Sequence, residues 1–321
     1  MLKNAKKLIF FQKYIILGIY SFFKKEDSMN YSGIGTLIKE LRELLGITQS
    51  DLCRNICSQA QISKIEKGAV IPLSSTLFLI CERLGISVND FYEACKNKRV
   101  DYTKEVFKQV RKYIRARNYQ EVMNIINIEK NGPAFQSNEG KQFLLWHEGI
   151  CTYHLYKNKK KAIELLKEAL RMSNTAQNAY SMREIEILNS IGIIYDDSGE
   201  FNKAENVLSE ALEGFNKISF KGDIQVKIKL LYNLSKSLTN SKKFNKSLVQ
   251  NELGESLCIE NDLIYLLGEH YFQRGHNYFC KGDLDKSIKF FEKAKVIFLI
   301  QNRNEFVEII TNRIKDIYTT K

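Results

Sequence analysis

A turn-and-helix pattern that recurs along the chain constrains its fold more than any other feature. In each copy, a polar turn is followed by an aromatic or aliphatic residue, two polar residues and a residue that opens an amphipathic helix. These key residues are spaced by 40, 42, 43 and 40 positions, and they are Val122, Ala162, Ala204, Ser247 and Ser287. A longer helical pattern precedes each turn, so each repeat is a helical hairpin.

Stacked hairpins bury a continuous core, and the last one leaves an apolar end that needs a cover. A final helical pattern at residues 304–318 supplies this cover. The hairpins resemble tetratricopeptide repeats, although their period exceeds the usual ~34 residues. The resemblance predicts a right-handed superhelix of about five hairpins with a C-terminal capping helix. Its concave groove is expected to be lined by the first helix of each hairpin and to hold an extended peptide or a partner protein.

Composition places the whole chain in the all-α class. Only two prolines, Pro72 and Pro133, occur in 321 residues, and strand-like alternation is nearly absent. The length is sufficient for two domains. We expect a helix-turn-helix DNA-binding domain at residues 29–97 and a tetratricopeptide-like domain for peptide binding and dimerisation at residues 98–321.

Residues 46–68 contain two short helical patterns back to back, in the sequence G-I-T-Q-S-D-L-C-R-N-I-C-S-Q-A-Q-I-S-K-I-E-K-G. The first is predicted at residues 48–56 with Thr48 as N-cap, and the second at residues 59–67 with Ser58 as N-cap. A link of about four residues suits a helix-turn-helix, whose second helix lies in the DNA major groove. Gly68 is expected to terminate the second helix, with Glu66 in a structural role.

The outward side of the second helix carries residue types that recognise DNA. Gln pairs with adenine and Lys with guanine, while Ser and Lys hold phosphate. The predicted outward residues are Gln59, Gln61, Ser63, Lys64 and Lys67. The pattern T-Q-x-x-L followed by I-S-x-I-E-x-G resembles lambda-repressor-like domains, which implies that Gln49 and Ser58 contact the DNA backbone and that Gln59, Gln61 and Lys64 read bases. A small helical core without a DNA role is the alternative.

Neighbouring helical patterns complete a five-helix unit. The first helix is predicted at residues 34–45, and its inward residues are Leu37, Leu41, Leu44 and Leu45. Pro72 is expected to open the fourth helix and Gly85 to end it. Residues 29–97 hold seven basic and seven acidic residues, although the whole chain has a net charge of +12. Bulk charge therefore gives no argument for DNA binding, which must depend on the placement of single cations and helix N-termini.

Residues 1–28 differ from the rest of the chain. Their apolar run, residues 8–23, is interrupted by Gln12 and Lys13, is shorter than the ~20 residues of a membrane span, and lacks a small-residue cleavage site. We interpret residues 1–28 as the product of an upstream start codon and not as part of the fold. A membrane-anchored regulator is the alternative, whereas our main interpretation is a cytoplasmic protein without membrane contact.

Cysteine and histidine patterns give no sign of catalysis or metal binding. The seven cysteines include no C-x-x-C motif, which fits a reducing cytoplasm. The four histidines form no catalytic, metal-binding or phosphate-binding motif. We therefore expect a protein that is not an enzyme and has no catalytic residues, no metal and no cofactor. A thiol sensor at Cys53 and Cys57 is the alternative to buried, inert cysteines.

Two asparagines occupy equivalent points of successive repeats. Asn189 lies 15 residues before Ala204, and Asn233 lies 14 residues before Ser247. Because an Asn side chain both donates and accepts hydrogen bonds, a ladder of them on successive first helices can pair with a peptide backbone. The alternative is that each Asn caps or bridges helices within the array.

The complete chain resembles the RRNPP family of quorum-sensing regulators over residues 30–318. The resemblance rests on the domain order and on the motifs N-I-C-S-Q-A-Q-I-S-K-I-E-K-G-A-V-I-P, N-D-F-Y-E, Q-F-L-L-W and Y-F-Q-R-G. It implies a homodimeric transcription activator that binds palindromic double-stranded DNA and is switched by a short re-imported signalling peptide. A phage or mobile-element regulator whose repeats bind a partner protein shares this architecture and is the alternative.

The family resemblance also implies where the peptide binds. The matching positions are Tyr92, Arg115, Arg117, Asn189, Asn233 and Glu269, with Tyr271 and Phe272 as an apolar wall. The two arginines stand where the family has lysines, and they suit a peptide carboxylate. Glu269 stands where the family has Gln, which implies a peptide that presents a hydrogen-bond donor or a cation.

Overall fold

The computed structural model describes residues 32–95, 98–173, 180–218 and 223–320, so the extension predicted at residues 1–28 lies outside the described residues. Every regular element in these ranges is a helix, which confirms the all-α prediction. The chain divides into two compact units, and the boundary between Lys108 and Gln109 falls inside helix α7. The domain boundary predicted after residue 97 stays a prediction.

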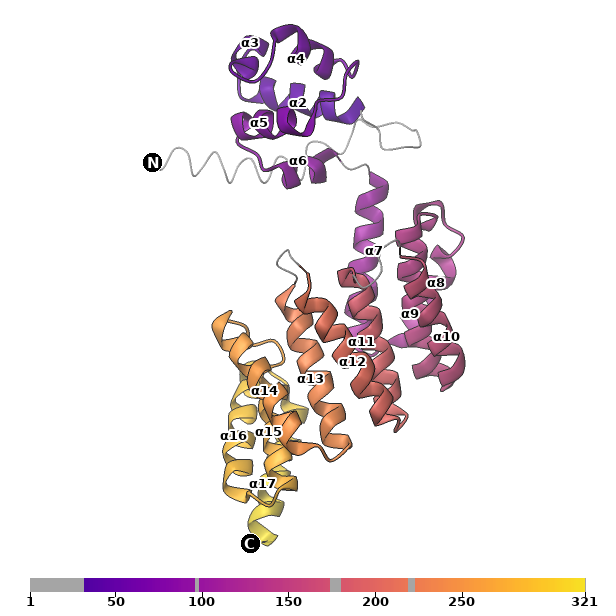
Figure 1. Ribbon diagram of the computed structural model, residues 1–321, viewed down its shortest axis with the longest axis vertical. Coiled ribbons are helices and arrows are strands. Elements are labelled where there is room, and N and C mark those ends of the chain that lie inside the picture. Colours follow the sequence, from indigo (N-terminus) through magenta and orange to yellow (C-terminus); the bar gives the residue numbers. More distant parts are fainter. Residues whose placement is uncertain (1–31, 96–97, 174–179, 219–222, 321) are drawn as a thin grey trace. The chain divides into compact units, whose positions relative to one another are not determined.

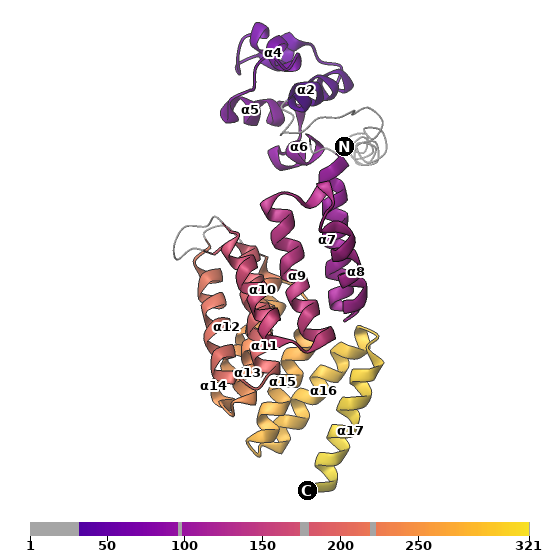
Figure 2. The same cartoon turned by 90° about the vertical axis from the view of Figure 1, so that its right-hand side faces the viewer.

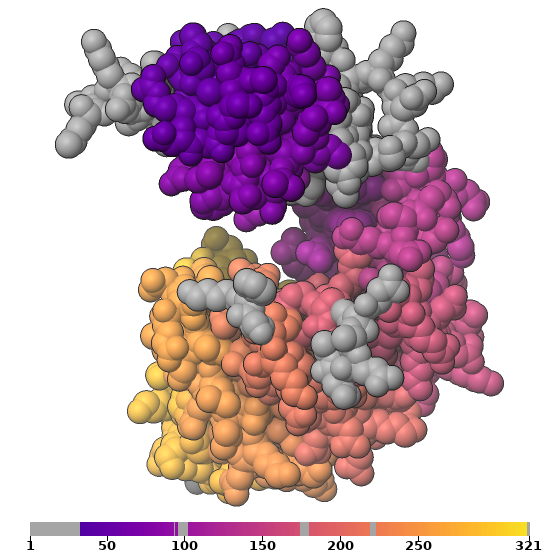
Figure 3. All heavy atoms as spheres, turned by 45° about the horizontal axis from the view of Figure 1, so that its top comes forward, coloured from indigo at the N-terminus to yellow at the C-terminus, as the bar shows by residue number. Residues whose placement is uncertain are grey.

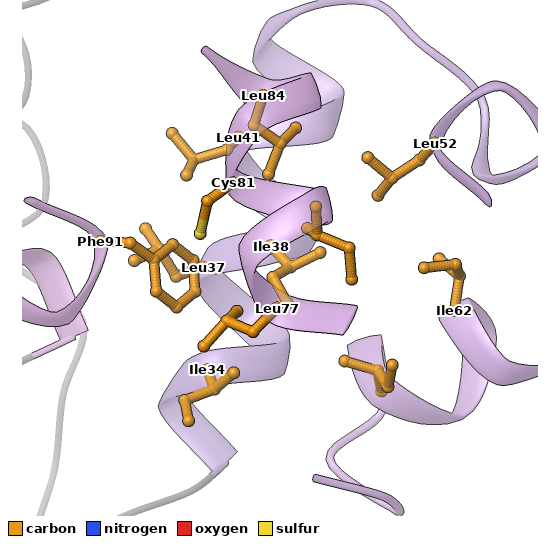
Figure 4. Packing of buried hydrophobic residues seen from close by; sticks show 12 residues of the cluster. Ile34, Leu37, Ile38, Leu41, Leu52, Ile62, Leu77, Cys81, Leu84 and Phe91 are labelled. Atoms are coloured by element: carbon orange, nitrogen blue, oxygen red, sulfur yellow. The ribbon is translucent and has the colours of Figure 1, made fainter. Parts of the chain in front are cut away.

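Within residues 32–95 of the first unit, five helices surround one core (Figure 1). They are α2 (Ser32–Leu44), α3 (Gln49–Cys53), α4 (Gln59–Glu66), α5 (Ser74–Leu84) and α6 (Val88–Cys95). Each contributes buried apolar side chains to the core. Figure 4 shows Leu52 of α3 and Ile62 of α4 pointing toward Ile38 of α2, and all three are fully buried. The two short helices are therefore held by tertiary packing, because helices of this length are not stable alone.

The end of α2 corrects one expectation. Leu37 and Leu41 are buried as predicted, but Leu44 and Leu45 are 64% and 41% exposed. The helix ends at Leu44, and Gly46 takes a left-handed conformation with φ of +68°. The chain therefore turns away from the core at this end of α2. The apolar spacing that predicted Leu44 and Leu45 as core residues does not hold there.

The second unit consists of helical hairpins and a last helix, as predicted (Figures 1 and 2). The five hairpins are α7 (Lys98–Arg115) with α8 (Tyr119–Glu129), α9 (Asn138–Tyr156) with α10 (Lys159–Arg171), α11 (Met182–Asp197) with α12 (Phe201–Asn216), α13 (Ile224–Asn240) with α14 (Phe244–Glu260), and α15 (Leu267–Cys280) with α16 (Leu284–Ile300). A short 3-10 helix, η2 (Pro133–Phe135), joins α8 to α9. In the space-filling view, the atoms of successive hairpins abut one another (Figure 3).

Small residues let the two helices of a hairpin approach closely. The five key residues of the repeat, Val122, Ala162, Ala204, Ser247 and Ser287, are all fully buried. On the facing helices, a Cβ atom added at Gly149, Gly192 or Gly275 would lie 2.9 Å or less from Leu166, Leu208 or Phe291, respectively. The key residues of the repeat pattern therefore mark the places where the two helices of a hairpin are in close contact.

A buried polar cluster joins α13, α14 and α15, and we call it the Ser247 network. The Ser247 hydroxyl lies 2.9 Å from the Thr239 hydroxyl and accepts a 2.8 Å hydrogen bond from Asn277. Gln273 donates to the Thr239 hydroxyl at 2.7 Å. All four side chains are buried, so each hydrogen bond satisfies a group that water cannot reach. The network explains how a serine is accommodated at a repeat position that holds valine or alanine in the first three hairpins.

Helix α17 (Asn304–Thr320) covers the apolar end of the array, as predicted. Its buried residues Ile310, Ile314 and Ile317 join a core cluster with Phe291 and Phe298 of α16. No helix in the described ranges has the length and apolar character to cross a bilayer.

Candidate DNA-binding helix and peptide-binding face

The two helices of the helix-turn-helix have the predicted N-caps. The Thr48 hydroxyl accepts a hydrogen bond from the Asp51 backbone N–H, and the Asp51 carboxylate accepts one from the Thr48 N–H. Ser58 caps α4 by accepting from the Gln61 N–H. Helix α3 is shorter than predicted: it ends at Cys53, and Asn55 has a φ of +58°. The turn therefore takes up residues that the periodic pattern had assigned to the helix.

The glutamate at the end of α4 has the predicted structural role. The Arg42 Nε donates to Glu66 at 2.6 Å, and the Gln49 amide donates to the same carboxylate at 2.8 Å. Burial alone would raise the pKa of Glu66, but the hydrogen bonds from Arg42 and Gln49 outweigh it and lower the pKa below 4.5. Glu66 thus joins α4 to α2 and α3. The Gln49 side chain is engaged within the unit, and its predicted contact with the DNA backbone stays a prediction.

Arg83 is a residue that sequence reasoning missed. Its Nη1 donates to the backbone carbonyls of Asp51 and Leu52 at 3.2 and 3.1 Å, and also to that of Arg54. These carbonyls lie at the end of α3, where intrahelical partners are missing. Arg83 therefore fixes the turn from α5. The only signal in the sequence is a basic residue in the last turn of α5, which does not reveal a partner 30 positions earlier.

Three of the five predicted outward residues of α4 are exposed, and these are Gln59, Lys64 and Lys67. Gln61 and Ser63 are half-buried, and their predicted contacts with DNA stay predictions. They flank Ile62, which is fully buried, so they lie at the edge of the inward stripe. The exposed surface of α4 thus combines one Gln with two Lys, and Ser58 is exposed beside it.

The first helices of the later hairpins carry the predicted asparagine ladder. Asn233 of α13 donates a 2.7 Å hydrogen bond to Asn189 of α11, so the two side chains bridge neighbouring helices. Asn189 is buried and Asn233 is half-buried. We call the surface formed by Glu186, Asn189, Lys229, Asn233 and Glu269 on α11, α13 and α15 the first-helix face. The bridge is the alternative considered for these asparagines, and their contact with a peptide stays a prediction.

Charges on and around this face are only partly compensated. Glu186 pairs with Arg111 of α7 at 3.3 Å and with Lys229 of α13 at 3.5 Å. Arg115 and Arg117, by contrast, are exposed and have no ion pair within the described ranges. These two cations at the end of α7 remain available to an anion.

Glu269 has one satisfied and one unsatisfied oxygen. Its Oε1 accepts a hydrogen bond from Arg303, which precedes α17, while its buried Oε2 has no partner among the described residues. Burial, together with the Glu269 charge, raises the pKa of Tyr265 to about 12. The same two causes raise the pKa of Tyr232. The buried Oε2 of Glu269 is therefore an acceptor at which a hydrogen-bond donor would be stabilising.

The two residues of the predicted apolar wall differ in their burial, and their contact with a peptide stays a prediction. Phe272 is half-buried, with its ring centroid 5.4 Å from that of Phe291. Tyr271 is instead a core residue, only 8% exposed and packed against Phe290. Tyr271 follows Glu269 by two positions and so points to another side of the helix, whereas Phe272 follows by three. Tyr92, in the first unit, is 41% exposed.

Burial affects the thiol groups of several cysteines. Burial raises the pKa of Cys81 to about 11 and that of Cys151 to about 12, as expected for inert thiols. Burial also raises the pKa of Cys57. Within the described ranges, no group of three or more His, Cys, Asp or Glu residues is arranged to hold a metal ion.

Two ranges of the chain match models of known protein families. Residues 107–319 match the RNPP family C-terminal domain, and residues 38–91 match a helix-turn-helix domain. The chain belongs to the RNPP family. The family predicted from the sequence motifs is thereby confirmed, together with the fold of a helix-turn-helix unit followed by helical repeats.

Solved structures of RNPP regulators have the same fold. The crystal structure of Bacillus thuringiensis PlcR in complex with the peptide PapR7 and DNA is 26% identical, covers 88% of this chain and 99% of its own, and has a TM-score of 0.74. PlcR in its apo form is 24% identical with the same coverage and a TM-score of 0.62. ComR from S. thermophilus, in complex with DNA and its signalling peptide ComS, is 16% identical over the same shares, with a TM-score of 0.63. A search of curated proteins found no match.

Proposed function

We propose that this RNPP-family chain is a cytoplasmic, homodimeric transcription activator whose binding to palindromic DNA is controlled by a short signalling peptide. The observation that carries the proposal is that one chain combines a helix-turn-helix, whose two helices both have side-chain N-caps, with the RNPP repeat domain. PlcR, the relative at 26% identity, was solved with both a peptide and DNA.

The DNA half of the proposal rests on α4. Gln59, Lys64 and Lys67 are exposed along the helix, while Ile62 and Ile65 anchor it in the core. Gln and Lys side chains pair with adenine and guanine in the major groove, and Lys also holds phosphate. The network of Arg42, Glu66 and Gln49 keeps α4 at a fixed angle to α2 and α3.

The peptide half rests on the first-helix face. Each of the asparagines that now bond to one another offers a donor and an acceptor that an extended backbone can use instead. Arg115 and Arg117 suit a peptide carboxylate, and the free oxygen of Glu269 suits a donor or a cation on the peptide. A peptide that binds one arrangement of the dimer more tightly than the others shifts the population toward it. DNA affinity then changes because the recognition helices must lie about 34 Å apart to meet successive half-sites.

The test is binding of the full chain to a labelled library of palindromic duplexes, with and without a synthetic peptide. The peptide is taken from the short reading frame nearest the gene. Tighter, sequence-specific binding in the presence of peptide supports the proposal. Binding that ignores every such peptide would contradict the peptide half and favour a partner protein.

Matched variants separate the two halves. Asn233→Ala should abolish the peptide effect and preserve peptide-independent DNA binding, whereas Asn206→Ala, at an exposed asparagine of α12, should change neither. Lys64→Ala should weaken operator binding, while Lys39→Ala, on α2, should not. If Lys64 holds a phosphate, its loss also reduces the slope of log affinity against log salt by about 1.

A further inference from the structure

We infer that the turns within the last four hairpins form a cationic surface that binds the phosphate backbone of double-stranded DNA without reading its sequence. The surface comprises the turn between the two helices of each hairpin, together with the first residues of the second helix. We call it the turn edge, and its segments are residues 157–161, 198–205, 241–246 and 281–286. The inference goes beyond the proposed function, because it concerns the repeat unit alone and needs neither an operator nor a signalling peptide.

The turn edge carries much of the positive charge of the chain. Its four segments hold ten lysines and four carboxylates, a surplus of six, and the whole chain has a net charge of +12. The helix-turn-helix domain adds nothing to this total, since residues 29–97 hold seven basic and seven acidic residues. Half of the positive surplus therefore lies on one set of turns in the repeat unit, where it attracts a polyanion.

Side-chain contacts join the four segments into one surface. Each segment is linked to the next by a lysine side chain, and the pairs are Lys159 with Glu200 at 2.5 Å, Lys243 with Glu205 at 2.5 Å, and Lys281 with Asn245 at 2.6 Å. Packed helices lie about 8–10 Å apart, so four successive turns extend over roughly 30 Å. This length is close to one turn of a DNA duplex, which is about 34 Å.

Several lysines of the turn edge have no acidic partner. The exposed ones without an ion pair within the described ranges are Lys157, Lys160, Lys161, Lys242 and Lys281. A hollow of about 400 Å³ at the start of α14 is lined by Lys242, Lys243, Lys246 and Lys281, together with Phe244 and Asn245. No carboxylate belongs to this lining, so the hollow favours an anionic group such as a phosphate.

The composition of the turn edge favours DNA over a protein as the partner. All its cations are lysines, and no aliphatic or aromatic side chain of its four segments is exposed. The centre of a protein–protein interface is typically enriched in aromatic residues and Arg and depleted of Lys. Lysine binds phosphate as a point charge, and contacts with the DNA backbone carry no sequence information. The turn edge therefore suits the backbone of a duplex of any sequence.

The test measures binding of the purified full chain to a labelled duplex of random sequence, without signalling peptide, at several salt concentrations. One variant combines Lys160→Gln, Lys161→Gln, Lys242→Gln and Lys281→Gln. It should bind the duplex at least about tenfold more weakly, and the slope of log affinity against log salt should fall by about 3, since each phosphate contact contributes about 0.9.

The matched control removes the same charge from exposed lysines elsewhere on the repeat unit. It combines Lys141→Gln, Lys167→Gln, Lys217→Gln and Lys315→Gln. Because these lysines lie outside the turn edge, the slope should change by less than about 1. Circular dichroism confirms that each variant is folded.

Removal of the counter-charges gives a second measurement with the opposite sign. Glu200 and Glu205 each lie within 4.0 Å of two lysines. Glu200→Gln combined with Glu205→Gln should therefore strengthen binding to the random duplex by more than about threefold, because four lysines then face the phosphates without a competing carboxylate. Damage to the fold would weaken binding instead.

Two results would overturn the inference. One is an unchanged affinity and salt slope in the variant of four turn-edge lysines, which would leave an acidic protein as the partner of this surface. The other is an equal loss of binding in the matched control. Loss of random-duplex binding in the turn-edge variant of a chain that prefers no operator would support the inference and contradict the proposed function.

Discussion

Glu66 is the residue that fixes the angle of the recognition helix, because its carboxylate reaches both α2 and α3. Glu66→Gln would leave the buried Arg42 guanidinium with only the exposed Glu43 carboxylate, 3.5 Å away, as a counter-charge, and we expect a loss of about 3 kcal/mol in the stability of the first unit. Urea denaturation measures this loss. Glu40→Gln, at an exposed position of the same α2, is the control and should change stability by less than ~0.5 kcal/mol.

Glu66 should also make the stability of the first unit fall at acid pH. Folding lowers the pKa of Glu66 from 4.5, so its contribution to stability is present above pH 4.5 and is lost as the pH falls through the folded-state pKa. The Glu66→Gln variant should lack this step, and an identical acid response in both proteins would contradict the assignment.

His270 predicts a second pH dependence, in the repeat unit. Burial lowers its pKa from 6.5 to about 4, and the hydrogen bond to the Ile228 carbonyl offsets only part of that effect. Because the folded state favours the neutral ring, the stabilisation is complete above pH 6.5 and declines by about 3 kcal/mol as the pH falls to 4. His270→Gln should flatten the curve of stability against pH between these values. The slope is the measurement, since the substitution also changes packing.

The role of a single residue could be predicted from the sequence where it depends on residues that are close in the chain. The caps at Thr48 and Ser58 follow from positions next to a helical pattern, and the role of Glu66 from a family motif. Prediction failed where the partner is distant in the chain. The contacts of Arg83 cannot be read from spacing, whereas the equivalent repeat positions of Asn189 and Asn233 allowed a bridge between helices as an alternative. Tyr271 is buried on another side of the helix from Glu269, and its predicted contact with a peptide stays a prediction.

At the scale of elements, the crossing of α2 and α4 depends on one glycine. A Cβ atom at Gly35 would lie 2.0 Å from the backbone oxygen of Ile65, which cannot move without shifting α4. Gly35→Ala should therefore destabilise the first unit by several kcal/mol and impair DNA binding, since overpacking alone costs ~1–3 kcal/mol. Gly33→Ala, on the same helix, meets no atom closer than 3.9 Å and should be neutral or slightly stabilising. Thermal unfolding of the two variants compares them directly.

The hairpins could be predicted as elements because each repeats the same close contact. The buried key residues recur at nearly constant spacing, and a turn signal stands before each of them. The first unit has no such internal copy. Its helix ends at Leu44 and Cys53 are set by left-handed turn residues, Gly46 and Asn55, which helical periodicity does not detect.

At the scale of the whole molecule, the two units have separate cores. We propose that they unfold separately, and we expect calorimetry of the full chain to resolve two transitions. Gly35→Ala should lower the temperature of one transition, and His270→Gln should shift only the other. One cooperative transition displaced by both substitutions would contradict the proposed domain organisation.

The Ser247 network has a consequence for how the amino-acid sequence of such an array can change during evolution. A change of Thr239, Ser247, Gln273 or Asn277 alone removes at least one hydrogen bond between these side chains in a place closed to water. Single substitutions at these four positions are therefore expected to be destabilising. Replacement of all four side chains together by another compatible set is not. Chimeras assembled from two relatives should tolerate a crossover within the α11–α12 hairpin, but they should fail at the turn between α13 and α14 unless both parents carry the same four side chains.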